Sequence, residues 1–467
     1  MKIKFLLVIS LLLKSIFSTA QSHENDSIDS THIEYKSLEE WAKKSTWYFH
    51  SRSYFMNTIN EGALKDDFTI AQGAGIGLRT APLKGFQMGF SGYFIFNVFS
   101  SDLAAQDKTT GAMNRYEIGQ YNVTNFKNQN NLSRFEDLFL KYTYKKSNLM
   151  VGRMEMNTPF INAQDGRMRP TFVEGLGLNL KKNEKFSFSA SYVWRMMPRS
   201  TFQYYLFEDA TGLYSQGLNT NGTKSDYNKN IKTIGFFTSH LCFTPFKNFK
   251  INIWNGYFDN VMNTGIIEVK NEFKKNDHSS FYQALMYVRQ DAVNYGGNEN
   301  QNKTYIRKGA QSHSISGQFG FKNKKLNLNL NYTHITDDGR YLMPREWGRD
   351  PFYTFMSRER NEGSGGVDAI STNIIYQAIA QKLKLGIGYG YFKMPKVTDV
   401  RLNKYGMPAY HQVNISASYQ FQKKFRGMEL RMLAASKFKD GNEYLAPKYV
   451  YNKVNMVNLN LILDIKI

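Results

Sequence analysis

The chain has 467 residues, of which 15% are aromatic and 42% hydrophobic, yet its mean hydropathy is negative at −0.49. Its formal charge of +21 at pH 7 suits nucleic acid, anionic surfaces or anionic solutes. A single cysteine, Cys242, excludes an internal disulfide framework.

The first residues have the features of a secretory signal. Lys2 and Lys4 precede an apolar run over 5–13, and the small residues that signal peptidase needs end at Ala20. We expect cleavage after Ala20, a short periplasmic segment over 21–44 and a membrane domain over 45–467. Beyond the signal there is no run of about 18 apolar residues, so we expect no membrane-spanning helix.

Apolar and polar residues then alternate in many segments, from about residue 46 to the end of the chain. Clear examples lie at 86–98, 186–195, 326–333, 383–391, 411–421 and 457–467. A period of two places apolar side chains on one face and polar side chains on the other. Roughly ten residues per segment is the length of a tilted strand that crosses the outer membrane. The sequence therefore predicts an all-β fold, a transmembrane antiparallel β-barrel closed by its last strand, 457–467.

Connection lengths predict the number of strands. Short turns near 322–325, 380–381 and 422–426 are assigned to the periplasm, and long polar connections to the outside. Seventeen strands are evident, but with both chain ends in the periplasm the strand number must be even. A segment with weaker alternation at 265–273 is the predicted additional strand, which gives 18 strands and nine outer loops. The longer loops are expected near 99–134, 154–175, 196–230, 290–311, 336–366, 393–410 and 439–453.

Two loops have a composition suited to folding into the barrel. The third contains TPFINAQDGRMRPTFVEG at 158–175, with Arg167 and Arg169. The seventh contains PREWGRDPFYTFMSRERNEG at 344–363, in which four arginines alternate with four acids among aromatic residues. A barrel of 18 strands is wide enough for an aqueous channel unless loops enter it. We expect both loops to fold inward and constrict the channel.

These two stretches resemble motifs of the OprD family of substrate-specific outer-membrane porins, and the likeness extends from about Leu38 to the C-terminus. The resemblance implies an 18-stranded barrel whose third and seventh loops narrow a pore within each chain. It also implies that inward basic residues lead carboxylate-bearing solutes, such as amino acids and small organic acids, through the constriction. Members of the family that take up chito-oligosaccharides are known, so a sugar porin is the alternative within the family.

Basic residues are the candidates for solute selection, because a guanidinium binds a carboxylate through a two-point fork and rings of positive charge favour anions. The candidates for the constriction are Arg167, Arg169, Arg345, Arg349, Arg358 and Arg360. The candidates for a lumen ladder fall on the polar phase of their predicted strands: Arg79, Lys141, Arg195, Lys232, Lys250, Arg289, Lys384, Arg431 and Lys437. Two alternatives stay open: the ladder residues are ordinary polar positions of the wall, and the seventh-loop arginines belong to an ion-pair scaffold with the neighbouring acids.

Catalysis has no support in the sequence. A GxGxG pattern over 73–77 is followed by no helical pattern, and the aspartate pairs at 66–67 and 337–338, the latter near His334, have no further ligand spacing around them. We expect no enzyme, no cofactor and no metal site.

Two hypotheses from different classes remain. The first is a porin in the outer membrane of a Gram-negative bacterium. The second is a structural or adhesive outer-membrane protein with a plugged lumen. The expected partners are outer-membrane lipid, lipopolysaccharide, small solutes and the barrel assembly machinery, but not nucleic acid, and the chain is expected to be a monomer or a weak trimer.

Overall fold

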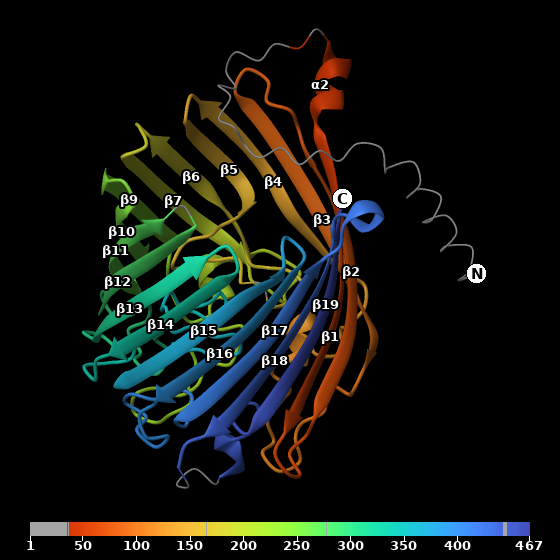
Figure 1. Ribbon diagram of the computed structural model, residues 1–467. Coiled ribbons are helices and arrows are strands. Elements are labelled where there is room, and N and C mark those ends of the chain that lie inside the picture. The colour runs from red at the N-terminus through yellow and green to blue at the C-terminus, as the bar shows by residue number, and fades with distance from the viewer. Residues whose placement is uncertain (1–34, 36, 165, 277, 442–445) are drawn as a thin grey trace.

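The computed structural model describes residues 35, 37–164, 166–276, 278–441 and 446–467. Its main feature is a closed antiparallel barrel, in which β19 pairs with β1 (Figure 1). Within the described residues eighteen strands form the wall, which confirms the predicted fold class and strand number. The predicted signal over 1–20 and most of the predicted periplasmic segment over 21–44 lie outside the described residues.

The wall strands follow one another around the barrel in chain order. Their bounds are β1 Thr46–Asn60, β2 Asp67–Arg79, β3 Phe86–Ser100, β4 Leu132–Tyr144, β5 Ser147–Glu155, β6 Phe172–Lys181, β7 Phe186–Met197, β9 Phe236–Phe246, β10 Phe249–Phe258, β11 Met262–Asn276, β12 Ser279–Ala292, β13 Gln311–Asn323, β14 Leu326–Ile335, β15 Val367–Ile379, β16 Leu383–Lys393, β17 Tyr410–Gln420, β18 Met428–Lys439 and β19 Met456–Lys466. The weak segment predicted at 265–273 is β11.

The remaining elements are short. They are α2 Leu38–Lys44, η2 Glu117–Gln120, β8 Tyr205–Leu206, α3 Phe207–Ala210, η3 Lys423–Phe425 and η4 Pro447–Tyr449. Helix α2, which was not predicted from the sequence, begins after Ser37, whose hydroxyl accepts a hydrogen bond from the Glu40 amide. The Trp41 indole donates to the Ala81 carbonyl and so fixes α2 to the turn between β2 and β3. No helix in the described part of the chain is long and apolar enough to cross a membrane.

The connections differ at the two ends of the barrel. Short turns lie at the end where β1 begins and β19 ends, and long loops lie at the other end, as predicted. Numbered by their place along the chain, the long loops are loop 2 (101–131), loop 3 (156–171), loop 4 (198–235), loop 6 (293–310), loop 7 (336–366), loop 8 (394–409) and loop 9 (440–455).

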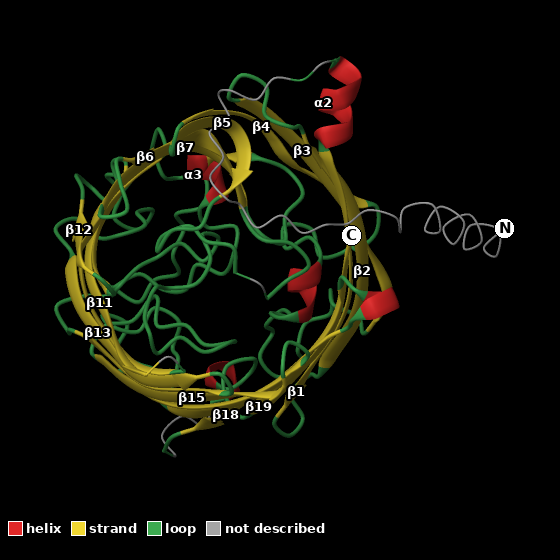
Figure 2. Cartoon of the chain, turned by 45° about the horizontal axis from the view of Figure 1, so that its top comes forward, coloured by secondary structure: helices red, strands yellow, loops and turns green. Residues whose placement is uncertain are grey.

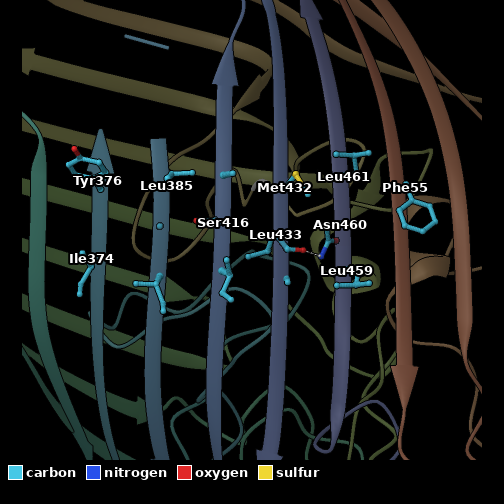
Figure 3. A pocket seen from close by; sticks show the side chains of 15 residues that line it. Phe55, Ile374, Tyr376, Leu385, Ser416, Met432, Leu433, Leu459, Asn460 and Leu461 are labelled. Atoms are coloured by element: carbon cyan, nitrogen blue, oxygen red, sulfur yellow. Dashed lines mark hydrogen bonds between the residues drawn. The ribbon is translucent and has the colours of Figure 1, made fainter. Parts of the chain in front are cut away.

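The wall has an apolar outer face and a polar inner face. In β14, Leu328 and Leu330 are exposed on the outside, whereas Asn331 and Thr333 are buried on the inside. Figure 3 shows the outer wall from β15 round to β1, where apolar side chains such as Leu461 line a hollow of about 630 Å³. This division suits a wall with lipid on one side and a polar interior on the other.

Loops fill much of the interior (Figure 2). Loops 3 and 7 fold inward as predicted, and loop 4 joins them in one apolar cluster with inward side chains of the wall. Loop 2 forms a second cluster, in which Tyr121 packs near Tyr54 and Tyr93 of β1 and β3. The inward folding of loops 2 and 4 was not predicted.

Candidate functional site

Trp347 holds loop 7 inside the barrel mouth. Its side chain is 2% exposed, and its ring lies 4.6 to 5.7 Å from the rings of Phe207, Phe236 and Phe258, measured between centroids. The Trp347 carbonyl also accepts a hydrogen bond of 2.9 Å from the amide of Asn162 in loop 3. Loops 3, 4 and 7 therefore pack against one another, and the arginines that they carry have fixed relative positions.

Two acids of loop 7, Glu346 and Asp350, accept hydrogen bonds from backbone amides, and Glu362 accepts one from the Tyr405 hydroxyl. One Glu346 carboxylate oxygen accepts hydrogen bonds from the amides of Gly212 and Tyr214 in loop 4, at 3.0 and 2.9 Å. One Asp350 oxygen accepts from the amides of Asn361 and Glu362, at 2.9 and 3.1 Å. These two acids therefore shape the loop backbone, and among the described residues neither forms an ion pair within 4.0 Å, although the charges of Glu346 and Glu362 still favour the charged form of Arg345.

The loop 7 arginines contact aromatic rings and carbonyl groups. Arg345 lies 4.9 Å from the Tyr405 ring centroid, and Arg360 donates to the Gly348 carbonyl at 2.5 Å. Arg349 lies 5.3 Å from the Phe355 ring centroid and is exposed. Among the described residues, no carboxylate oxygen lies within 4.0 Å of a loop 7 arginine. The ion-pair scaffold that the sequence allowed is therefore not formed.

Arg358 fastens loop 7 to the wall. Its guanidinium donates to the side-chain oxygens of Asn458 at 2.7 Å and Asn460 at 2.5 Å on β19, and to the Tyr54 hydroxyl at 3.1 Å. Its backbone φ is +71°, a conformation uncommon outside glycine, and the Lys437 ammonium donates to its carbonyl. These contacts make Arg358 a positioning residue as well as a source of charge.

The two loop 3 arginines differ in their partners. The Arg169 guanidinium forks onto the buried Glu136 carboxylate of β4, with Nε at 2.8 and 3.0 Å from its two oxygens, and donates from Nη1 to the His50 Nδ1 at 2.8 Å. Arg167 donates to the Gly166 carbonyl at 2.7 Å, and within the described residues it has no carboxylate in ion-pair range. Arg169 thus shares the Glu136 carboxylate with Arg134, whose Nε lies 3.1 Å from it, whereas Arg167 contacts no carboxylate among the described residues.

Six guanidiniums from four loops form an arginine cluster. Its members are Arg115 of loop 2, Arg167 of loop 3, Arg199 of loop 4 and Arg345, Arg358 and Arg360 of loop 7. Burial lowers the pKa of Arg167 to about 9, and the charges of Arg358 and Arg199 act in the same direction. Burial likewise lowers the pKa of Arg199 to about 10. Both groups stay protonated at pH 7, so the cluster gathers positive charge from four loops, with Glu346 and Glu362 acting on Arg345.

Most ladder candidates lie on the inner phase of the wall. Arg79 and Lys141 pair with Gly89 and Gln87, which lie two positions apart on β3, so the two basic residues are close neighbours. Lys250 and Lys384 alternate with outward apolar residues near the short-turn end. Arg431 and Lys437 also face inward, but Arg431 forms an ion pair with Asp464 at 2.6 Å.

Three ladder candidates do not line the lumen, which corrects the prediction. An extra residue, Trp194, interrupts the register of β7, so Arg195 faces outward and lies 3.8 Å from the Glu174 carboxylate. Arg289 also faces outward, since its neighbours Val288 and Gln290 in β12 are buried on the inside. Lys232 lies in loop 4 and belongs to no strand. A two-residue period cannot show the bulge beside Arg195 or the strand end beyond Lys232. At Arg289 the register of β12 is unbroken, but the strand has apolar residues on both faces, so its alternation is ambiguous.

Arg115 and Arg199 were not among the residues predicted from the sequence. Both lie in loops whose inward folding was not predicted, so no strand phase could point to them. The only signal in the sequence for Arg199 was its place just after an apolar strand end, where Pro198 begins loop 4.

Comparisons with known proteins agree with this architecture. The model of the family described as outer membrane porin, OprD family, matches residues 96–361. Among solved structures, the chain is similar to Pseudomonas aeruginosa OccK9 (OpdG), with TM-score 0.70 and 11% identity over 91% of this chain and 99% of that chain. Acinetobacter baumannii OccAB4 gives TM-score 0.69 and 16% identity over 91% and 98%.

A third similar structure contains a ligand. Pseudomonas aeruginosa OpdK, crystallised with vanillate, gives TM-score 0.66 and 13% identity over 91% of this chain and 99% of that chain. No curated protein matches by sequence. Because the family model matches more than half of a chain that folds as an 18-stranded barrel, the protein belongs to the OprD family of outer-membrane porins.

Proposed function

We propose that this porin passes small carboxylate-bearing solutes, such as amino acids and small organic acids, by passive diffusion, and that the arginine cluster selects them. The observation that carries this proposal is the absence of any carboxylate within 4.0 Å of Arg167 or of the loop 7 arginines, among the described residues. Nearby Glu346 and Asp350 accept backbone amides instead. The positive charge of the cluster is therefore available to a passing anion.

The chemistry of the guanidinium suits this task. A planar fork of N–H donors matches the two oxygens of a carboxylate, and it keeps its charge at physiological pH. Several guanidiniums close together make the mouth attractive to anions and unfavourable to cations. The exposed Arg349 is the group best placed to meet a solute first, and Arg167 contributes from loop 3. Release requires that no single contact be strong, which agrees with charges spread over several loops.

Two further observations support the proposal. Inward-facing Arg79 and Lys141 lie close together beyond the mouth, where they would continue a positive path toward the short-turn end. The similar protein OpdK was crystallised with vanillate, which is a carboxylate. At 13% identity this ligand supports the chemical class only and identifies no solute of this porin.

Liposome swelling tests the proposal. Vesicles containing the protein should swell fastest with small acidic solutes, more slowly with neutral ones of the same size, and slowest with basic ones. Arg167→Ala, which removes a charge of the arginine cluster, should reduce the advantage of the acidic solutes, whereas Arg195→Ala, which removes the same charge from the outer face, should leave it unchanged. Faster swelling with chito-oligosaccharides than with acidic solutes would instead favour a sugar porin.

The same proposal includes how the protein reaches and occupies the membrane. The signal would be cleaved after Ala20, residues 21–44 would stay in the periplasm, and 45–467 would be inserted by the barrel assembly machinery. Outward-facing charges at the long-loop end, such as Arg195 and Arg289, would then lie at the height of lipopolysaccharide headgroups. The chain would act as a monomer or a weak trimer. The mass of the mature protein tests the cleavage site directly.

A further inference from the structure

A polar pocket lies among the outer loops and takes no part in the proposed selection of solutes. It has a volume of about 520 Å³ and is formed by residues of loops 4, 6, 7 and 8. A cavity of this size suits a solute as large as a sugar. Its basic lining residues are Arg307, Lys308, Arg340, Arg401 and Lys404, and one carboxylate, that of Asp338, lines it. We call it the outer pocket.

The basic residues of the outer pocket have two different roles. Arg340 is 8% exposed, and its guanidinium donates to the carbonyls of Leu218, Val400 and Arg401, so it joins loops 4 and 8. Arg307 and Lys308 are exposed on loop 6, and the described structure gives the Arg307 guanidinium no partner. Arg340 therefore builds the pocket, whereas Arg307 and Lys308 are exposed to a ligand, with the Lys308 ammonium 4.3 Å from the Tyr295 ring centroid.

The buried side of the outer pocket carries polar groups with unused hydrogen-bonding capacity. Tyr305 lines the pocket and is 5% exposed, and its hydroxyl has no hydrogen-bond partner among the described residues. Lys404 is 2% exposed, and its ammonium donates to the Tyr227 hydroxyl at a long 3.4 Å. Its charge is further balanced by the rings of Tyr227 and Tyr305, each 4.8 Å away at the centroid.

The charges around Lys404 come from several loops. Glu346 and Glu362 of loop 7 favour its charged form, and Arg340 and Arg345 oppose it. A buried hydroxyl without a partner is costly, and a ligand oxygen would relieve that cost. The pocket thus combines buried donors with exposed positive charge.

The remaining lining is rich in amide and hydroxyl groups. Asn219, Asn221 and Gln301 contribute amides, and Thr220 and Ser225 contribute hydroxyls. The amide nitrogens of Asn219, Asn221 and Gln301 already donate hydrogen bonds within loops 4 and 6, so these side chains shape the lining. The Tyr305 hydroxyl, which has no partner among the described residues, is open to a neutral oxygen of a ligand, while the basic residues favour a negative charge on it. We propose that the outer pocket is a second binding site, which holds a hydroxylated organic anion of sugar size, such as a sugar acid or a sugar phosphate.

Isothermal titration calorimetry of the full chain in detergent micelles tests this proposal. The probes are glucuronate, glucose 6-phosphate and glucose. We expect at least one of the two anions to bind at least about tenfold more tightly than glucose, since each charge-assisted hydrogen bond is worth about a factor of ten. The two anions separate carboxylate from phosphate recognition. Equal binding of all three probes, or binding of none, would overturn the proposal.

Variants locate the binding. The double variant Arg307→Ala/Lys308→Ala should weaken binding of the anion about tenfold or more. The matched pair Lys108→Ala/Lys127→Ala, which removes two exposed charges from loop 2, should leave binding unchanged. Asp338→Asn should tighten binding, because it removes the carboxylate that lines the pocket. Tyr305→Phe should weaken binding about fivefold without changing the shape of the pocket.

An equal loss of anion affinity in the two double variants would show that the anion is attracted to the charged surface as a whole. That result would refute a specific site in the outer pocket. Calorimetry measures binding at equilibrium, whereas the proposed selection of carboxylates is measured as transport. Failure of one proposal therefore leaves the other intact, although both involve anions.

Discussion

Replacement of Trp347 by alanine tests whether loop 7 must be fixed for the pore to be selective. Trp347 is 2% exposed, so nearly all of a surface of about 250 Å² is buried. At about 25 cal/mol per Å² this gives an upper estimate of roughly 6 kcal/mol. Measured losses for buried tryptophan changed to alanine are about 3–5 kcal/mol. Even about 3 kcal/mol shifts the balance between a seated and a released loop about 150-fold.

Single-channel recording in planar bilayers measures the consequence. Trp347→Ala should conduct with frequent transitions to larger currents, because loop 7 leaves the mouth for part of the time. The barrel itself should stay folded, since the wall hydrogen bonds are unaffected. On gels, unheated Trp347→Ala should therefore migrate faster than the same protein after heating, as we expect of the wild type. Trp47→Ala removes a tryptophan that is 58% exposed and should change neither property. If Trp347→Ala conducts a steady current of wild-type size, without transitions to larger currents, the role assigned to this residue is refuted.

Three further predictions concern the loops. Gly119→Ala should alter anion preference without loss of a charge, because its new Cβ would overlap the Arg167 Nε and displace that guanidinium; wild-type reversal potentials would contradict this. Glu136→Ala should lower the stability of the barrel by about 3–5 kcal/mol by leaving the buried Arg134 and Arg169 without the carboxylate that they share, and Arg169→Ala in the same chain should restore part of it, as heat-dependent gel migration would show. Burial lowers the pKa of Lys404 to about 8, so the outer pocket loses a positive charge as the pH rises through that value. Calorimetry should therefore show weaker anion binding at pH 9 than at pH 7. Lys404→Met should remove that difference.

The wall of the barrel was readable from the sequence because each strand has lipid on one side. The alternation of Leu328 and Leu330 with asparagines fixed the orientation of β14, and parity of the strand number located β11. Where a bulge or a strand end intervenes, the two-residue period loses its meaning. Arg195 was placed on the wrong face for this reason. Arg289 was misplaced for another reason: β12 keeps its register there but carries apolar side chains on both faces, so its alternation does not show which face is inward.

The loops were only partly readable, because their contacts join residues far apart in the chain. The aromatic and charged composition of loop 7 correctly predicted that it folds inward. It did not show that Glu346 would accept amides of Gly212 and Tyr214, which lie more than a hundred residues earlier. The ion-pair alternative therefore stayed open until the partners of the acids were known. The same long-range contacts brought Arg199 into the arginine cluster.

The measurement that tests the central claim most directly is the reversal potential of the channel across a salt gradient. The wild-type protein should prefer chloride over potassium, Arg167→Ala should reduce that preference, and Arg195→Ala should keep it, because only Arg167 belongs to the arginine cluster. Equal effects of the two variants, or a wild-type channel that prefers potassium, would contradict selection by the arginine cluster.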